Sequence, residues 1–287
     1  MAADTSRPGF LGHRLLGEVM GAGKEEGADV MDAPAVALVG AAYEVAGRSV
    51  LRGLDLQIPK GQRVAIIGPS GAGKTTVLRL VAGLLRPTAG SVTTLGQHPG
   101  QLRGRDLRSL RRRLGWMQQD HNLVPQLRVA HTVLIGRLGQ WPWWRAVWSL
   151  GRPQQLELVE GALRDVGMAD RLWSLPGELS GGERQRIAVA RLLLQGPELN
   201  LVDEPAAGLD VRAAEEIVQL ILRTAGIHGQ ALLMTVHSLA LLGAGFDRVV
   251  AIRAGELAAD GPPESFTETR EVEIYGRDPA GGPAITV

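Results

Sequence analysis

A glycine-rich stretch at residues 68–76 constrains this chain more than any other part of its sequence. The stretch reads Gly-Pro-Ser-Gly-Ala-Gly-Lys-Thr-Thr and fits the pattern G-x-x-x-x-G-K-S/T. The apolar run at residues 64–67 precedes it, and a segment with helical periodicity at residues 75–85 follows it. A strand, a glycine loop and a helix in this order predict a phosphate-binding loop. Backbone N–H groups can turn inward around the anion, and the helix N-terminus adds its dipole.

Two side chains of this stretch have defined roles in the phosphate-loop hypothesis. Lys74 can reach the β- and γ-phosphates of a nucleotide, and the Thr75 hydroxyl can take one ligand position of Mg²⁺. A similar stretch at residues 21–25 fails the pattern, because Glu18 and Glu25 stand where Gly and Ser/Thr are required. We therefore assign nucleotide binding to the first stretch, whose residues are Gly68, Pro69, Ser70, Gly71, Ala72, Gly73, Lys74, Thr75 and Thr76.

The composition excludes several classes of protein. The chain has 287 residues, a formal net charge of +1 and no cysteine. A disulfide scaffold and any thiolate metal site are therefore excluded, and the near-neutral charge gives no general case for nucleic-acid binding. No run of 18 apolar residues occurs, and the N-terminus lacks the order of a signal peptide. We expect any role at a membrane to be exerted from one side.

The chain divides into an extension, one large domain and a tail. Residues 1–33 are rich in glycine, alanine and charge, which predicts a flexible extension; an amphipathic docking or membrane-surface element is the alternative. Residues 34–276 alternate strands and helices around the phosphate loop, which predicts an α/β fold with a mostly parallel, covered sheet. Ligands of such sheets bind at the carboxyl ends of the strands. Residues 277–287 remain as a tail.

An arginine-rich segment and a tryptophan cluster each have alternative interpretations. Six arginines fall within residues 103–113, but Leu107, Leu110 and Leu114 keep core spacing, so we prefer a solvated helical face to a nucleic-acid site. The cluster can form a helical core, which is the default, an interfacial membrane anchor or a partner-docking surface. It contains four of the six tryptophans, namely Trp141, Trp143, Trp144 and Trp148.

Two carboxylates and a histidine end two further apolar strands. Asp203 and Glu204 close one of these strands, and His237 follows the other. Because carboxyl ends of parallel strands lie at one edge of a sheet, these groups can converge on the phosphate loop. Asp203 would hold Mg²⁺, directly or through water, and Glu204 would act as general base on the attacking water. His237 could hydrogen-bond the γ-phosphate, whereas a structural role is the alternative.

Together with further motifs, these residues resemble the ATP-binding cassette family of transport ATPases over residues 34–276. The phosphate loop resembles the Walker A motif of this family, and residues 201–204 resemble its Walker B motif. Residues 179–183, Leu-Ser-Gly-Gly-Glu, match the signature that distinguishes the family among phosphate-loop proteins. The remaining matches are Gln119 as the Q-loop glutamine, Asp210 in the D-loop, His237 as the switch histidine and Tyr43 as the base-stacking aromatic.

The resemblance implies a P-loop NTPase with a RecA-like core, an antiparallel β subdomain and a helical signature subdomain inserted at about residues 97–178. It implies ATP and Mg²⁺ as cofactors, with Gln119 a metal and catalytic residue beside Thr75 and Asp203. In the family, two ATP molecules lie between two subunits, each held by one Walker A motif and the opposite signature. The signature residues implied in binding are Ser180, Gly181, Gly182 and Glu183, with Asp210 of the D-loop.

The resemblance also implies partners. We expect a homodimer that docks on transmembrane permease subunits at the cytoplasmic face of the inner membrane, serves a solute-binding protein indirectly and binds no nucleic acid. Importer ATPases for phosphonates have similar segments at residues 133–139, 143–145, 252–255, 260–263 and 274–276. The alternatives are a cassette for another oxyanion or for lipid or peptide export, and a non-transport cassette acting on DNA or a ribosome or as a scaffold in an enzyme complex.

The sequence departs from the family pattern at a few positions. Gln118 stands where an aromatic is usual, so Gln118 and Gln119 are both candidates for the Q-loop residue. Asn200 places an amide inside an otherwise apolar strand and therefore requires a hydrogen-bond partner. Neither departure removes a catalytic group.

Overall fold

The computed structural model describes residues 33–118, 123–142, 144, 148–149 and 154–276. The N-terminal extension up to residue 32, Gln119, Trp143 and the tail from residue 277 therefore lie outside the described residues. Within the described part of the chain, no helix is both long and apolar enough to cross a membrane.

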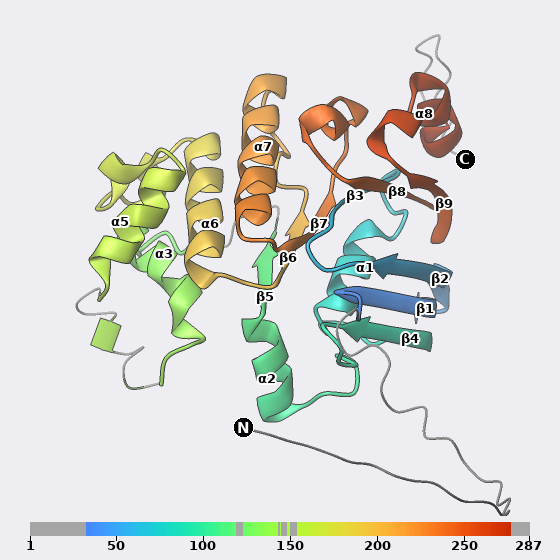
Figure 1. Cartoon of the computed structure of the whole chain (residues 1–287), viewed down its shortest axis with the longest axis horizontal. Helices are drawn as coiled ribbons and strands as arrows, with labels where there is room; N and C mark the ends of the chain where they lie inside the picture. The colour runs from blue at the N-terminus through green and yellow to red at the C-terminus, as the bar shows by residue number, and fades with distance from the viewer. Residues whose placement is uncertain (1–32, 119–122, 143, 145–147, 150–153, 277–287) are drawn as a thin grey trace, which may run out of the picture. The chain divides into compact units, whose positions relative to one another are not determined.

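The described residues form two sheets, of which the smaller is antiparallel (Figure 1). Its strand order is β2-β1-β4, with β1 in the middle, and these strands span Arg48–Ile58, Val36–Val45 and Ala89–Thr94. The antiparallel pairing agrees with the antiparallel β subdomain that the family resemblance implies.

The larger sheet positions the candidate site. Its order is β5-β6-β7-β3-β8-β9, and every neighbouring pair is parallel except β8 with β9. The order places β6, β7 and β3 side by side, so the segments that follow these strands meet at one edge. The strands are β3 (Arg63–Ile67), β5 (Leu114–Met117), β6 (Leu199–Asp203), β7 (Ala231–Thr235), β8 (Arg248–Arg253) and β9 (Glu256–Gly261).

Helices cover the larger sheet and build a separate bundle beside it, in which α3 and α5 pack on α6 (Figure 1). The helices are α1 (Lys74–Val81), α2 (Gly104–Arg112), α3 (Val129–Leu138), α5 (Leu156–Asp165), α6 (Gly181–Gln195), α7 (Val211–Ile227) and α8 (Glu268–Tyr275). Short 3₁₀ turns occur at η1 (Ala169–Arg171), η2 (Pro176–Glu178), η3 (Leu239–Ala244) and η4 (Pro263–Ser265).

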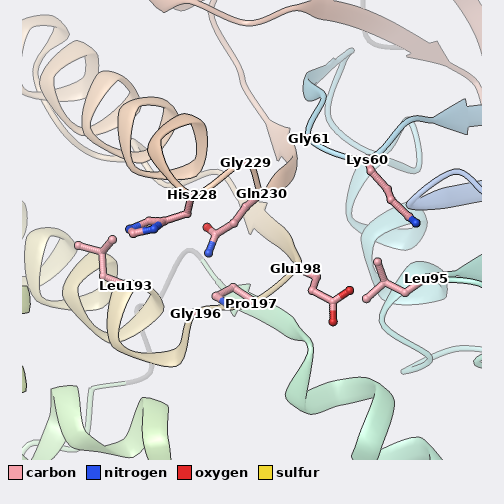
Figure 2. Close-up of a pocket in the computed structure, with 10 residues that line it drawn as sticks. All are labelled: Lys60, Gly61, Leu95, Leu193, Gly196, Pro197, Glu198, His228, Gly229 and Gln230. Carbon is pink, nitrogen blue, oxygen red and sulfur yellow. The ribbon is translucent and has the colours of Figure 1, made fainter. Parts of the chain in front are cut away.

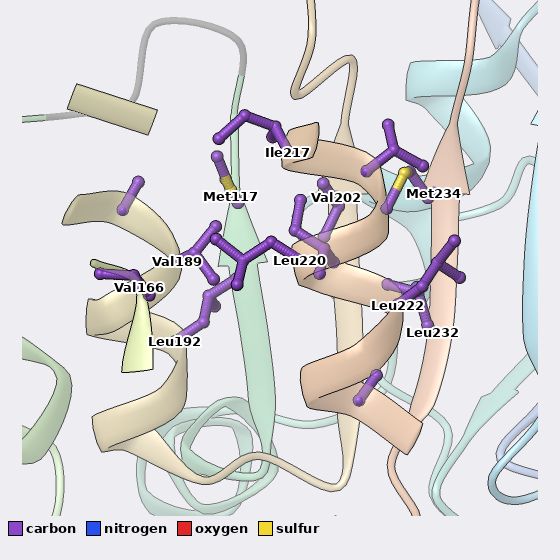
Figure 3. Close-up of a cluster of buried hydrophobic side chains, with 14 of the residues drawn as sticks. Met117, Val166, Val189, Leu192, Val202, Ile217, Leu220, Leu222, Leu232 and Met234 are labelled. Atoms are coloured by element: carbon purple, nitrogen blue, oxygen red, sulfur yellow. The ribbon is translucent and has the colours of Figure 1, made fainter. Parts of the chain in front are cut away.

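The central strands are buried on both faces. In β3, Val64 and Ile66 belong to one hydrophobic cluster, whereas Ala65 and Ile67 belong to the other. Because successive side chains of a strand point to opposite faces, this alternation shows that the strand separates two cores. Figure 3 shows the second core, where side chains of α6 and α7 pack against the sheet. Burial on both faces explains why these strands read as continuous apolar runs.

Helix α1 is shorter than the sequence predicts. The expected end was Leu85, but the helix ends at Val81, and Gly83 adopts a left-handed conformation with φ of 64°. The N–H of Gly83 donates to the carbonyl of Leu80 and that of Leu84 to the carbonyl of Arg79, at 3.0 and 2.8 Å. This pair of bonds is a Schellman motif, which satisfies carbonyls at the end of the helix.

Two elements at the C-terminal side of the sheet were missed from sequence. Strand β9 pairs back on β8 through a turn in which Gly255 has a φ of 82°, and helix α8 packs on β8. Most side chains of β9 are exposed, so this edge strand lacks the apolar run that marks the central strands.

The arginine-rich segment forms α2, as the sequence predicts. Leu110 is fully buried, Leu107 is half-buried, and most of the arginines are exposed. Leu114 lies in β5 instead of on the helix. The tryptophan cluster differs from its default interpretation as a core. Trp141 packs against the larger core, but Trp144 and Trp148 are 58% and 72% exposed.

Candidate nucleotide site

The phosphate loop connects β3 to α1, and its backbone requires glycine at both ends. Gly68 has a φ of 144°, and a Cβ atom there would lie 2.0 Å from the carbonyl oxygen of Ile252. Gly73, with a φ of 104°, is the N-cap of α1. Both positions thus exclude residues with a side chain. Between them the loop lines a cavity of about 270 Å³ together with Val50, Glu204 and His237.

Lys74 is the only loop residue with a long side chain, and it is folded into the site. Its ammonium group donates to the carbonyl oxygens of Gly68 at 2.7 Å and Pro69 at 3.1 Å. The side chain is buried, with 5% exposure. Burial lowers the pKa of Lys74, whereas the charges of Glu204 and Asp203 partly oppose this shift. The site thus presents a desolvated cation beside the cavity.

The structure brings Asp203 of β6 next to the start of α1. Its Oδ1 accepts a hydrogen bond from the Thr75 hydroxyl at 3.2 Å and another from the Thr235 hydroxyl at 2.8 Å. The oxygen of Thr235 in turn accepts from the backbone N–H of Glu204 at 2.8 Å. A single, fully buried hydroxyl therefore fixes both carboxylate residues.

Sequence reasoning missed Thr235. Thr235 could have been found because it places a hydroxyl in the otherwise apolar run at residues 231–236. In the same way, Asn200 places an amide in the neighbouring strand. That amide has the partner it requires, since Asn200 Nδ2 donates to Gln230 Oε1 at 2.8 Å.

Glu204 and His237 form a close pair at the mouth of the cavity. Glu204 Oε1 and His237 Nε2 are 2.6 Å apart, and the two side chains are 18% and 48% exposed. Glu204 has a φ of 49°, which is uncommon for a residue with a side chain. The N–H bond to Thr235 stabilises this backbone. The arrangement places a carboxylate that can accept a proton beside the phosphate loop.

The oxygen atoms near Thr75 suit a magnesium ion. The Thr75 hydroxyl and Asp203 carboxylate are hard oxygen donors 3.2 Å apart. Among the described residues no group of three His, Cys, Asp or Glu side chains could hold a metal without other ligands. The remaining ligand positions would thus fall to phosphate oxygens and water, as Mg²⁺ prefers.

The signature residues form the start of α6. Ser180 is the N-cap, and its hydroxyl accepts from the N–H of Glu183 at 3.3 Å, while Glu183 accepts from the N–H of Ser180 at 2.8 Å. These bonds to Ser180 lower the pKa of Glu183, and Arg171 adds to the effect. Ser180 is exposed, and none of residues 180–183 lines the phosphate-loop cavity.

Asp210 and Tyr43, two other predicted site residues, do not line this cavity. Asp210 caps α7, its Oδ1 accepting from the N–H of Ala213 at 2.9 Å. Tyr43 lies opposite Leu51 in the small sheet and packs against the adjacent core. Gln118 directly follows β5 and is described, whereas Gln119 lies outside the described residues. Base stacking by Tyr43 and the choice of Q-loop residue therefore stay predictions.

A larger cavity lies at the opposite edge of the sheet. Figure 2 shows the residues that line it, none of which is a predicted site residue. Its volume is about 420 Å³. Lys60, Glu198 and Gln230 line it, and each shortly precedes a strand of the parallel set. It thus lies at the amino ends of the strands, away from the edge where ligands of such sheets bind.

Comparison with known proteins agrees with this geometry. The family model described as "ABC transporter" matches residues 51–207, which run from β2 through the phosphate loop and signature to the segment after Glu204. The chain belongs to the ABC transporter family. The solved structure of the ATP-binding cassette MJ0796, a dimer in a post-hydrolysis state bound to ADP and Pi, is similar with a TM-score of 0.69 and 26% identity. The match covers 79% of this chain and 98% of that one. The P-loop NTPase fold predicted from sequence is thereby confirmed.

Curated ABC relatives are similar over most of the chain. One is the phosphonates import ATP-binding protein PhnC of Pseudomonas entomophila, which is 42% identical over 82% of this chain and 89% of its own length. A second protein of this type, PhnC 2 of Synechococcus sp. strain JA-2-3B'a(2-13), is 41% identical over 83% and 89%. The resemblance to phosphonate-importer ATPases found from sequence is therefore confirmed.

Proposed function

We propose that this chain is the ATP-hydrolysing subunit of an importer for phosphonates or related oxyanions, working on one face of a membrane. One observation supports the proposal that the chain hydrolyses ATP. Residues of the phosphate loop after β3, Glu204 after β6 and His237 after β7 line one cavity. Asp203, the last residue of β6, accepts a hydrogen bond from Thr75 of the loop. The substrate part is supported by the relatives, which are named as phosphonate import proteins.

We assign the chemical roles as follows. Lys74 and the N–H groups of the loop bind the phosphates of ATP, and Glu204 accepts the proton of the attacking water. His237 holds the Glu204 carboxylate and can turn toward the γ-phosphate. Thr75 and Asp203 are the protein ligands for Mg²⁺, which would neutralise charge on the phosphates.

We further propose that two copies of the chain form the complete site. Ser180 at the start of α6 is exposed, and no residue of the signature lines the phosphate-loop cavity of the same chain. A helix N-terminus binds anions through unpaired N–H groups, so α6 of a second copy can cap the γ-phosphate. A second cavity of about 410 Å³ shares Glu204 and His237 and has Val211, 75% exposed, on its rim, as expected for a surface that a second copy covers.

We assign the docking surface for transmembrane subunits to the region around α2, α3 and the tryptophans. Residues of α2 and α3 line a cavity of about 800 Å³ there, and Trp141 is one of its lining residues. Trp144 and Trp148, a few residues further along the chain, are exposed. Replacing Trp144 and Trp148 by Ala should reduce recovery of a co-expressed permease without changing the thermal unfolding temperature. A large loss of thermal stability with normal permease recovery would contradict this assignment.

Reconstitution in liposomes tests the proposed function. The wild-type chain, its permease and its solute-binding protein should hydrolyse ATP faster when a phosphonate is added, and Glu204→Gln should bind ATP with Mg²⁺ but show almost no turnover. A neutral sugar and an amino acid serve as control solutes. Absence of stimulation by every phosphonate would remove the substrate proposal, whereas undiminished turnover of Glu204→Gln would remove the general-base role.

A further inference from the structure

A residue from the far end of the chain contacts the phosphate loop. The hydroxyl of Tyr275, the last residue of α8, accepts a hydrogen bond from the backbone N–H of Gly68 at 3.3 Å. The two residues are 207 positions apart in the sequence. Tyr275 lies outside residues 51–207, the segment that the family model matches. The contact is therefore not part of the matched family core.

Gly68 is the point at which the loop leaves β3, and its surroundings leave it little freedom. Its backbone lies against the carbonyl of Ile252, and its own carbonyl accepts the ammonium group of Lys74 at 2.7 Å. Gly68 is buried, so its N–H has a hydrogen-bond requirement that the Tyr275 hydroxyl meets. The carbonyl of the first loop residue thus has a partner within the loop, whereas its N–H has a partner 207 positions away.

Helix α8 packs on β8, the strand whose residue Ile252 lies against Gly68. Arg253, which follows Ile252 in β8, donates to the backbone carbonyl of Glu273, and Ile274 is 3% exposed. Gly276 ends the helix in a left-handed conformation with φ of 66°, directly after Tyr275. Strand β8 therefore contacts both the phosphate loop and the helix that carries Tyr275.

We propose that Tyr275 is a positioning residue for ATP binding, which holds the start of the phosphate loop in its phosphate-binding conformation. The proposal rests on the proposed function only in that this loop binds ATP. Without the hydroxyl, the loop can move so that the Gly68 N–H reaches water. Part of the population then no longer binds nucleotide, and the apparent dissociation constant rises by the inverse of the competent fraction.

Tyr275→Phe tests this proposal, because it keeps the ring and removes the acceptor. We expect the ATP dissociation constant and KM to rise by about three- to thirty-fold, with kcat within about two-fold of wild type, since the loop supports ground and transition states alike. Calorimetric ATP titration and steady-state kinetics measure these values. Amide exchange of a peptide covering the loop should also accelerate.

Ser265→Ala is the matched control. Ser265 braces the segment before α8, donating to the carbonyl of Pro262 at 2.8 Å and accepting from Arg270 at 3.2 Å, without touching the loop. This variant should lower the thermal unfolding temperature and leave KM unchanged. An unchanged KM in Tyr275→Phe, or an equal rise in Ser265→Ala, would overturn the proposal. Failure of wild type to bind ATP would instead contradict the proposed function.

Discussion

Removal of the Thr235 hydroxyl tests most directly which hydrogen bonds position the site residues. In Thr235→Val the methyl group replaces a hydroxyl that donates to Asp203 at 2.8 Å and accepts from the N–H of Glu204 at 2.8 Å. The residue is fully buried, so water cannot replace either bond without rearrangement. The change keeps the β-branched shape and volume, which isolates the effect of the hydrogen bonds.

The expected magnitude follows from the two bonds. A hydrogen bond to a charged group contributes about 1.5–3 kcal/mol, and an unpaired buried N–H costs about 1–3 kcal/mol. Relaxation around Glu204 offsets part of this, so we expect a loss of about 2–4 kcal/mol in the free energy of unfolding. That leaves a folded protein, since domains of this kind have about 5–15 kcal/mol.

Activity should fall further than stability explains. Glu204 has a φ of 49° and depends on Thr235 for its backbone partner. Without that bond the carboxylate no longer stays beside the phosphate loop, and we expect kcat to drop by about ten-fold or more, while ATP affinity changes little.

Denaturant titration and steady-state ATPase assays check these values, and Thr235→Ser is the control because it keeps the hydroxyl. We expect the serine variant to retain most of kcat. Equal activity of the valine and serine variants would refute the reasoning, since the loss could then not come from the hydrogen bonds.

Two further predictions concern other parts of the molecule. Gly68→Ala should abolish ATP binding measured by calorimetry while the chain stays folded, because a Cβ atom would lie 2.0 Å from a backbone oxygen of β8; retained affinity would contradict it. Hydrogen bonds from Arg63 lower the pKa of Asp247. As pH falls, the Asp247 carboxylate is therefore protonated at a higher pH in the unfolded state than in the folded state. The pair therefore stabilises the fold above about pH 4 and loses this effect at lower pH. Asp247→Asn should therefore weaken the dependence of the free energy of unfolding on pH below about pH 4. An unchanged dependence would contradict a stabilising role for the Arg63–Asp247 pair.

Much of the fold and part of the site could be predicted from local sequence signals. The strands that end before Gly68, at Asp203 and before His237 were placed correctly, because burial on both faces gives apolar runs bounded by glycine or charge. The local motif also predicted glycine at residue 68, whereas the carbonyl of Ile252 that excludes a side chain there comes from the tertiary structure. The end of α1 was misplaced, because Gly83 stops the helix before the more conspicuous proline at residue 87.

By itself, the sequence predicted which segment binds phosphate, and it indicated which strands are central and which family the chain belongs to. Only the tertiary structure decided which side chains hold those segments in place. The Thr235 hydroxyl joins Asp203 and Glu204 because β6 and β7 are neighbours, and Tyr275 reaches Gly68 because α8 packs on β8. Apolar periodicity encodes which face of a strand is buried, but it does not encode the order of strands. Contacts 32 and 207 residues apart therefore appear only after the chain has folded.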